Sequence, residues 1–249
     1  MSSPSLAQKL TAEAIGTAIL VFIGAGSVPL TVFLTAGAGG TGIDGTSGLS
    51  TISFAFSFAI FAAIYSIGHI SGAHINPAVT IALLATRKID ASTAGSYIVA
   101  QLIGAFIGAA LTLIILTGND PATLGLGAVS VDGKAGLAIG FAAEVIGTAI
   151  LVFTVFGAAV SGKAPAGFAG IAIGFIVYGI IILVGPITGA ALNPARQIGP
   201  DILEMLIGGG APAWDALALV YIAGPVVGGL VGAFLYEFIG RETPSAAAA

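Results

Sequence analysis

Long apolar runs separated by short polar connections dominate this chain. Six runs are long enough for a helix to cross a bilayer, which takes ~20 residues, and they fall near 10–35, 49–67, 94–117, 136–160, 167–184 and 215–239. Two of the connections contain several turn-forming residues, Gly37 to Gly42 and Gly118 to Lys134. We expect the first of these to be a flexible loop because glycine is conformationally permissive. We also expect the tail from Arg241, which ends in four alanines, to be disordered.

Two other connections contain a short apolar run that follows an Asn-Pro pair, Asn76-Pro77-Ala78 and Asn193-Pro194-Ala195. Asn is a preferred helix N-cap and Pro is tolerated at the first helical position, so each pair predicts the start of a helix. The first run, Pro77 to Thr86, has only about half of the ~20 residues that a spanning helix needs. We therefore predict two half-helices that enter from opposite faces and meet at mid-membrane.

The chain also repeats itself. Residues 11–22 recur almost unchanged at 142–153, which places Glu13 and Glu144 at equivalent positions, and the pattern of 97–108 recurs at 221–232. Each half then holds three spans and one half-helix, and because three is odd the second half must be inverted. The predicted fold class is an all-α membrane protein with six transmembrane helices plus two re-entrant half-helices. Its inverted 3+3 repeats are expected at approximately 10–117 and 136–239.

Composition supports the membrane class. The chain is 57% hydrophobic and only 7% charged, whereas soluble domains have ~25% charged residues. The net charge is −4 and no basic tract occurs, so a nucleic-acid partner is not expected. With no Cys and two His, neither disulfides nor a metal site is supported, and we predict no cofactor. No nucleophile–base pair is evident, so we predict that the protein is not an enzyme.

The few cations predict the orientation. Cytoplasmic connections carry an excess of Lys and Arg. Placing both termini in the cytoplasm leaves only Lys134 in an outer loop and puts the following residues inside: Lys9, Arg87, Lys88, Lys163 and Arg241. We therefore predict a multi-pass protein of the cell membrane, in contact with lipid, with both termini cytoplasmic.

Residues 68–80 (GHISGAHINPAVT) and 193–196 (NPAR) resemble the signature loops of the aquaporin family, also called major intrinsic proteins. The match extends to the Glu-containing first and fourth spans and covers essentially the whole chain. The filter positions described below make it similar to archaeal-type aquaporins. The resemblance implies a single channel domain over 1–249, and a homotetramer with one pore in each protomer.

The residue types of the two loops suggest how such a pore would work. A capping Asn oxygen accepts a backbone N–H, which leaves the amide NH₂ of Asn76 and of Asn193 free to donate to water. Two opposed helix N-termini, each equivalent to ~+0.5 charge, would repel cations at the same point. The alternative is that Asn76 and Asn193 are ordinary helix caps with no role in a pore. We expect the preceding loops to expose the pore-lining carbonyls of Gly72, Ala73, His74, Gly189, Ala190 and Ala191.

Three charged residues inside apolar surroundings need a role. Arg196 lies at the positive end of its helix, where a cation is disfavoured by ~0.3–1 kcal/mol. The resemblance makes Arg196 the constriction arginine, and the alternative is a lipid-headgroup anchor. Glu13 and Glu144 are predicted to support the loops by accepting backbone N–H groups. Alternatively they are proton-coupling carboxylates, which would make the protein an ion-coupled secondary transporter.

The resemblance places a four-residue selectivity filter at Phe56, Ile181, Ala190 and Arg196. Water-specific relatives have His where Ile181 stands, and glycerol channels have Gly there, Trp at Phe56 and Phe at Ala190. This chain departs from both patterns, and Gln197 replaces the Asp of most glycerol channels. We predict a water channel that is also permeable to small neutral solutes such as glycerol and excludes protons and ions. The alternatives are a dedicated glycerol or small-solute facilitator and a facilitator of a dissolved gas such as hydrogen sulfide.

Two further predictions concern histidines. His69 is expected to have a structural role and not to bind a ligand, and His74 to face the cytoplasmic vestibule.

Overall fold

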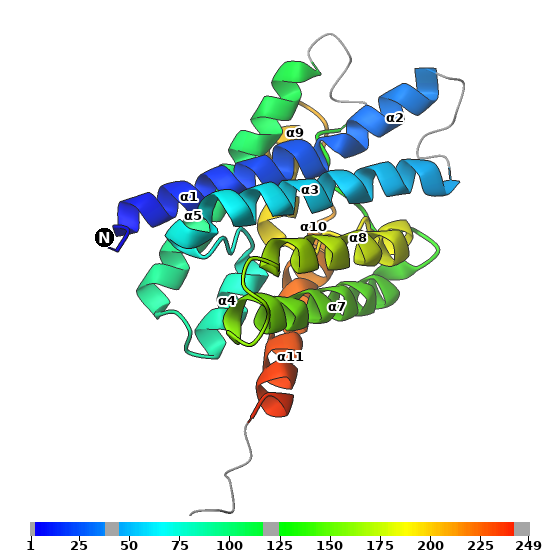
Figure 1. The fold of residues 1–249 in the computed structure, drawn as a ribbon. Helices are drawn as coiled ribbons and strands as arrows, with labels where there is room; N and C mark the ends of the chain where they lie inside the picture. The colour runs from blue at the N-terminus through cyan, green and yellow to red at the C-terminus, as the bar shows by residue number, and fades with distance from the viewer. Residues whose placement is uncertain (1–2, 38–44, 117–124, 242–249) are drawn as a thin grey trace, which may run out of the picture.

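The computed structural model describes residues 3–37, 45–116 and 125–241, and the regular elements among them are all helices (Figure 1). Most of the glycine-rich loop, residues 118–124 of the next predicted loop, and the tail beyond Arg241 lie outside these ranges. What was predicted for those segments therefore stays a prediction.

Six helical spans are long and apolar enough to cross a membrane, as predicted. The first combines α1 (Leu6–Ile19), a π-helical segment (Leu20–Ala25) and α2 (Ser27–Gly37). The next two are α3 (Gly45–Ser71) and α5 (Ala91–Ile115). The second half has α7 (Gly136–Val155) with a π-helical end (Phe156–Val160), α8 (Ala169–Thr188), and a last span of α10 (Trp214–Ala216), a π-helical segment (Leu217–Ala223) and α11 (Gly224–Ile239).

The two short helices begin at the proline of each Asn-Pro pair. They are α4 (Pro77–Ala85) and α9 (Pro194–Leu206). The helices before them, α3 and α8, run further than predicted, to Ser71 and Thr188. The polar end of α3 and Pro186 inside α8 do not stop them; each helix ends only where a glycine, Gly72 or Gly189, takes a left-handed φ of 91° or 77°.

The helices pack so that each half-helix is held by a span of the other half. The helix α1 packs against α5 and α3, while α7 packs against α11 and α8. Across the halves, α3 contacts α8, α9 lies on α5, and α4 lies on α11. Figure 1 shows α1 beside α3, and α7 beside α8. The half-helices therefore lie between the two halves.

Glycines allow two of these helix pairs to approach closely. A Cβ atom at Gly104 would lie 2.2 Å from the Ala14 carbonyl oxygen of α1, and one at Gly228 would lie 2.3 Å from the Val145 carbonyl oxygen of α7. No side chain fits at such distances, which is the usual reason for small residues in membrane helix contacts.

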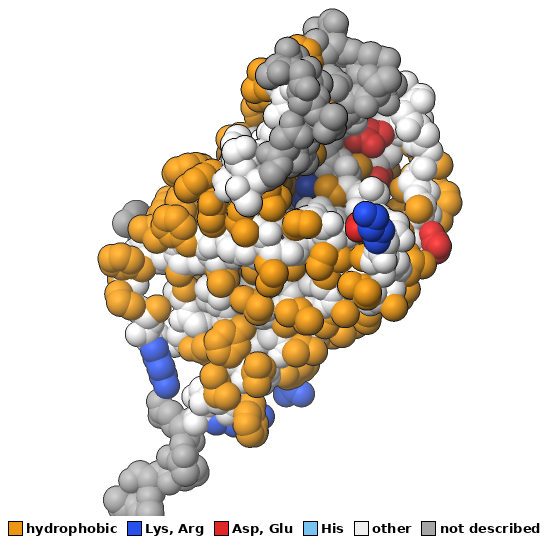
Figure 2. Space-filling view, turned by 90° about the vertical axis from the view of Figure 1, so that its right-hand side faces the viewer, with side chains coloured by type: hydrophobic (Ala, Val, Ile, Leu, Met, Phe, Trp, Pro, Cys, Tyr) orange, Lys and Arg blue, Asp and Glu red, His pale blue; other side chains and the backbone are white. Residues whose placement is uncertain are grey.

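The outer surface is apolar where lipid would contact it. Large apolar side chains such as Ile114, Leu183 and Phe238 are exposed on the spans. In Figure 2 hydrophobic side chains cover the middle of the visible face, and charged side chains lie toward its ends and edge. In water this surface would be unfavourable, so the molecule is an integral membrane protein.

Gly228→Val should destabilise the protein by about 1–3 kcal/mol, because the new side chain must push α11 away from α7. The matched control is Gly179→Val, since a Cβ at Gly179 meets no atom within 4 Å. Size-exclusion chromatography after heating in detergent should show an earlier loss of the folded peak for Gly228→Val alone. Equal melting of the two variants would contradict the close helix contact.

Candidate functional site

A buried carboxylate holds the loop before α4. One oxygen of Glu13 accepts from the Ser71 hydroxyl (2.6 Å) and from the His74 N–H (2.9 Å). The other accepts from the Ile75 N–H (2.7 Å) and from the Gln101 side-chain amide (2.8 Å). Glu13 is fully buried, so these donors replace the water that a carboxylate would otherwise bind.

Glu144 does the same for the loop before α9. One of its oxygens accepts from the Thr188 hydroxyl (2.6 Å) and the Ala191 N–H (2.9 Å), and the other accepts from the Leu192 N–H (2.7 Å). Glu144 is also fully buried. Both carboxylates are therefore engaged with loop backbone, which supports the loop-supporting role over the proton-coupling alternative.

The two loops share an uncommon backbone. Left-handed φ angles occur at equivalent positions in both, at Gly72, Ala73 and Ile75 and at Gly189, Ala190 and Leu192. For a residue other than glycine this region costs roughly 1–2 kcal/mol. The hydrogen bonds to the buried carboxylates offset that cost by fixing the loop N–H groups.

Each Asn of the Asn-Pro pairs caps its own half-helix. The Asn76 side-chain oxygen accepts from the Ala78 N–H (2.8 Å), and the Asn193 oxygen accepts from the N–H groups of Ala195 (3.0 Å) and Arg196 (3.3 Å). Both caps have the extended backbone of an N-cap. The N-termini of α4 and α9 are thereby placed beside the two amide groups.

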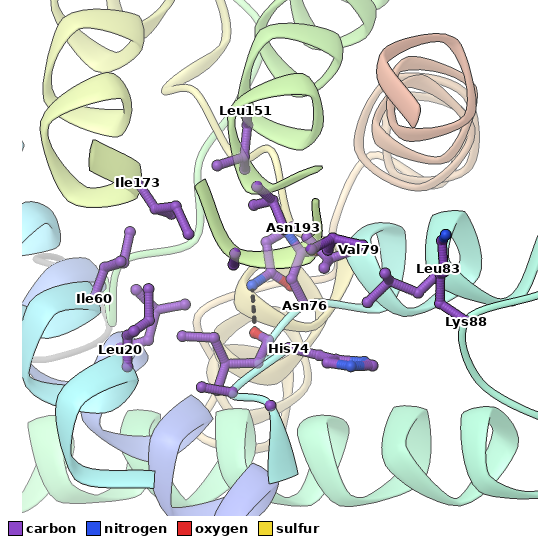
Figure 3. Close-up of a pocket in the computed structure, with 17 residues that line it drawn as sticks. Leu20, Ile60, His74, Asn76, Val79, Leu83, Lys88, Leu151, Ile173 and Asn193 are labelled. Atoms are coloured by element: carbon purple, nitrogen blue, oxygen red, sulfur yellow. Dashed lines mark hydrogen bonds between the residues drawn. The ribbon is translucent and has the colours of Figure 1, made fainter. Parts of the chain in front are cut away.

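The two amides also cross over to the opposite loop. Asn76 Nδ2 donates to the Leu192 carbonyl (2.9 Å), and Asn193 Nδ2 donates to the Ile75 carbonyl (2.8 Å; dashed in Figure 3). The prediction that capping leaves both amide hydrogens free was therefore wrong, because each amide uses one hydrogen to tie the loops together. One N–H of each amide is left for a ligand.

Both asparagines line a cavity of about 250 Å³ (Figure 3). Residues of the first loop, from Gly72 through His74 to Asn76, form part of its wall, and Lys88 also lines it. The rest of the wall is mainly apolar: Leu20, Ile60, Ile64, Val79, Leu83, Leu151, Val155, Ala159, Val160 and Ile173. A mainly apolar lining with a few polar groups suits a small neutral molecule that makes a few hydrogen bonds.

The histidines differ in their surroundings. His74 lines this cavity, with its Nδ1 atom 3.1 Å from the Thr80 hydroxyl and its ring against that of Tyr97. His69, by contrast, is exposed near the end of α3.

Arg196 lies buried beside Phe56. Its side chain is 1% exposed, and its guanidinium lies 5.0 Å from the centre of the Phe56 ring. The headgroup-anchor alternative is therefore wrong, since an anchor must reach the surface. Nη1 donates to the Gly127 carbonyl (2.6 Å), while Nε and Nη2 have no partner among the described residues. The hydrogens of Nε and Nη2 are therefore buried without an acceptor from the part of the chain that the structure describes.

The other two proposed filter residues are also buried. Ile181 lies on α8 and is 2% exposed, and Ala190 lies in the loop that follows this helix. Carbonyls of Gly189, Ala190 and Ala191 belong to that loop, whose residues do not line the 250 Å³ cavity. The Asn193 side chain alone reaches the cavity from this loop and the start of α9.

Two residues of the site, Gln101 and Gly127, were not predicted from the sequence. Gln101 donates to Glu13 and to the Thr80 hydroxyl (2.9 Å) from the middle of α5. A polar amide within an apolar span was a usable signal for it. Gly127 had no such signal, because every residue carries a carbonyl group.

A six-span membrane protein with two opposed, asparagine-capped half-helices at a central cavity has the architecture of a membrane channel. The chain matches the major intrinsic protein family over residues 1–236, and it belongs to that family.

Relatives and one solved structure agree with this assignment. A protein of Archaeoglobus fulgidus named "Probable aquaporin AqpM" is 43% identical over 96% of this chain and 99% of its own length. Aquaporin AqpM of Methanothermobacter marburgensis is 43% identical over the same shares. The X-ray structure of the aquaglyceroporin from Plasmodium falciparum superposes with a TM-score of 0.80 at 27% identity, over 94% of this chain and 96% of that one. This is a family of channels for water and small solutes, not of enzymes.

Glu144→Ala should lower the stability of the protein by at least ~2 kcal/mol, because three buried donors lose their acceptor at ~1–3 kcal/mol each. The control is Glu237→Ala, which removes only an exposed ion pair with Lys88 (3.2 Å), a type of pair that contributes ~0–1 kcal/mol. Thermal unfolding in detergent measures both. Equal melting temperatures would show that the carboxylate does not hold the loop.

Proposed function

We propose that this protein is a passive water channel that also admits small neutral solutes such as glycerol and excludes protons and ions. The single observation that carries the proposal is the crossed pair of asparagine amides at the point where α4 and α9 meet. Membership of the aquaporin family supports a channel for water and small solutes, and the finer selectivity is inferred from the residues.

The crossed amides explain how water would pass while protons do not. Each amide keeps one N–H, so two donors fixed at one point can hold the oxygen of a single water molecule. That water can then donate outward in both directions but cannot accept from its neighbours, which interrupts the hydrogen-bonded file along which protons hop. The N-termini of α4 and α9 add ~+0.5 charge each at the same point and so repel cations.

The filter residues suggest what else passes. Ile181 is apolar and extends less far from the backbone than the His of strict water channels, and Ala190 has a much smaller side chain than the Phe of glycerol channels. A wider and less polar constriction should let glycerol through. A dedicated glycerol or dissolved-gas facilitator is the alternative within this family. An ion-coupled transporter is less well supported, because Glu13 and Glu144 already accept several hydrogen bonds each.

We further propose the assembly and topology. The chain is a single channel domain with inverted repeats at approximately 10–117 and 136–239, and it forms a homotetramer with a pore in each protomer. It lies in the plasma membrane with both termini in the cytoplasm, as the positions of its cations favour.

Stopped-flow light scattering on proteoliposomes tests the proposed function. An osmotic step with sucrose should give water efflux faster than in protein-free vesicles, and a glycerol gradient should give a smaller, non-saturating solute flux. Water flux equal to that of empty vesicles would overturn the proposal. Solute flux that saturates and depends on an ion gradient would point to the coupled transporter.

Arg196→Val should raise glycerol flux and weaken the barrier to small cations. The substitution removes the one full charge beside Phe56 but keeps the two helix N-termini, so the cation leak should stay small. Glycerol permeability and ion leak are measured in the same vesicles, normalised to inserted protein. Unchanged glycerol flux in a correctly inserted variant would contradict a role for Arg196 at the constriction.

Ile181→His should shift the channel toward water. An imidazole extends further from the backbone than the Ile side chain and presents less apolar surface to the carbons of glycerol. Glycerol permeability should therefore fall by much more than water permeability, and it is the direction of the ratio that we predict. A flat or lower water-to-glycerol ratio would show that Ile181 does not line the constriction.

A further inference from the structure

We propose that Glu204 is a positioning residue for selectivity. It fastens the segment 125–129 to α9, and this fastening holds the Gly127 carbonyl where it fixes the Arg196 guanidinium. The inference rests on the proposed channel function and assigns part of its selectivity to a carboxylate two helical turns away from the constriction.

The Glu204 carboxylate accepts hydrogen bonds from the backbone of the segment 125–129. A single oxygen, Oε1, accepts from the Leu126 N–H (2.5 Å) and from the Ala128 N–H (3.3 Å). Gly125 and Gly127 have left-handed φ angles of 74° and 98°, which let the chain curl around that oxygen. With the N–H groups on both sides of Gly127 drawn to Glu204, the Gly127 carbonyl is presented to Arg196.

A second side chain of α9 supports the same segment. Gln197 accepts from the Val129 N–H (3.2 Å) and donates to the Val129 carbonyl (2.9 Å), and its amide also donates to Asp201 (3.1 Å). Arg196, Gln197 and Glu204 all belong to α9. The guanidinium and the two fastenings of its acceptor are therefore built on one rigid element, which keeps their spacing fixed.

Arg196 depends on that carbonyl. Among the described residues, Gly127 provides the only hydrogen-bond acceptor for the Arg196 side chain, and the Phe56 ring centre lies 5.0 Å from the guanidinium. Gly127 itself cannot take a side chain, because a Cβ there would overlap the Ala25 carbonyl. The carbonyl must consequently be positioned by groups outside the segment, and Glu204 contacts the residues on both of its sides.

Glu204→Ala should raise glycerol permeability as Arg196→Val does, but by less. Without the carboxylate the segment loosens, the guanidinium loses its fixed acceptor, and glycerol passes more easily. We expect the water-to-glycerol permeability ratio to fall about two- to tenfold. Glu204→Gln should keep the wild-type ratio, since an amide oxygen can still accept from both N–H groups.

The control for charge is Asp215→Asn. Asp215 lines the same hollow as Glu204, Gln197 and Asp201, but it accepts its hydrogen bond from the neighbouring Ala216 N–H and not from the segment 125–129. The substitution removes one negative charge and leaves the segment 125–129 untouched, so the ratio should not change.

A double-variant cycle separates positioning from a general loss of stability. In an Arg196→Val background the Glu204→Ala substitution should leave the ratio unchanged, because the group that the carbonyl holds is already gone. A further fall of the ratio in that background would overturn the proposal, as would an unchanged ratio in folded Glu204→Ala or a Glu204→Gln variant as impaired as Glu204→Ala.

The experiment distinguishes failure of the proposed channel function from failure of the positioning role of Glu204. If Glu204→Ala does not insert, Glu204→Asp, which withdraws the acceptor by one methylene group, is judged by the same ratio and the same cycle. If wild-type protein gives no water flux above that of empty vesicles, the proposed function fails. A conducting wild type with an unaltered Glu204→Ala ratio makes the positioning role fail alone.

Discussion

The central constraint on this structure is that two buried carboxylates hold two strained loops. Glu13 and Glu144 accept two backbone N–H groups each from the loops that contain the left-handed residues, and without these acceptors we expect the loops to relax. With the carboxylates in place, α4 and α9 start at fixed points and face each other. The asparagine contacts across the halves are possible only because these starting points coincide.

The two halves are not equivalent beyond this shared scheme. On the first side Gln101 adds a donor to Glu13 and links it to Thr80, so the polar groups are tied to one another within the membrane-embedded core. On the second side α9, the equivalent of α4, carries Arg196 and Gln197, which bind the connecting segment 125–129 instead. A symmetric scaffold thus supports the polar network around Glu13 on one side and the buried Arg196 guanidinium on the other.

Much of this could be predicted because the signals are local or repeated. The six spans follow from the length of the apolar runs, and the half-helices follow from the Asn-Pro pairs. The equivalent roles of Glu13 and Glu144 follow from the repeat. The helices α3 and α8 extend beyond their predicted ends. Polar residues near the end of α3 and Pro186 within α8 do not terminate these helices. The crossing of the asparagine amides and the contact of Glu204 with Leu126 join residues far apart in sequence. The partners in these contacts are backbone groups, and backbone groups are the same whatever the residue type, so the sequence does not indicate them.

If the two amides orient a water molecule and block proton passage, the protein must conduct water without conducting protons. Both fluxes can be measured in the same vesicles. Proteoliposomes carrying an internal pH-sensitive dye, with the membrane potential clamped by valinomycin and potassium, are given an osmotic step and, separately, a pH step. We expect fast water flux and a rate of internal pH change no greater than in protein-free vesicles. A pH change that accelerates in proportion to the inserted protein would contradict it.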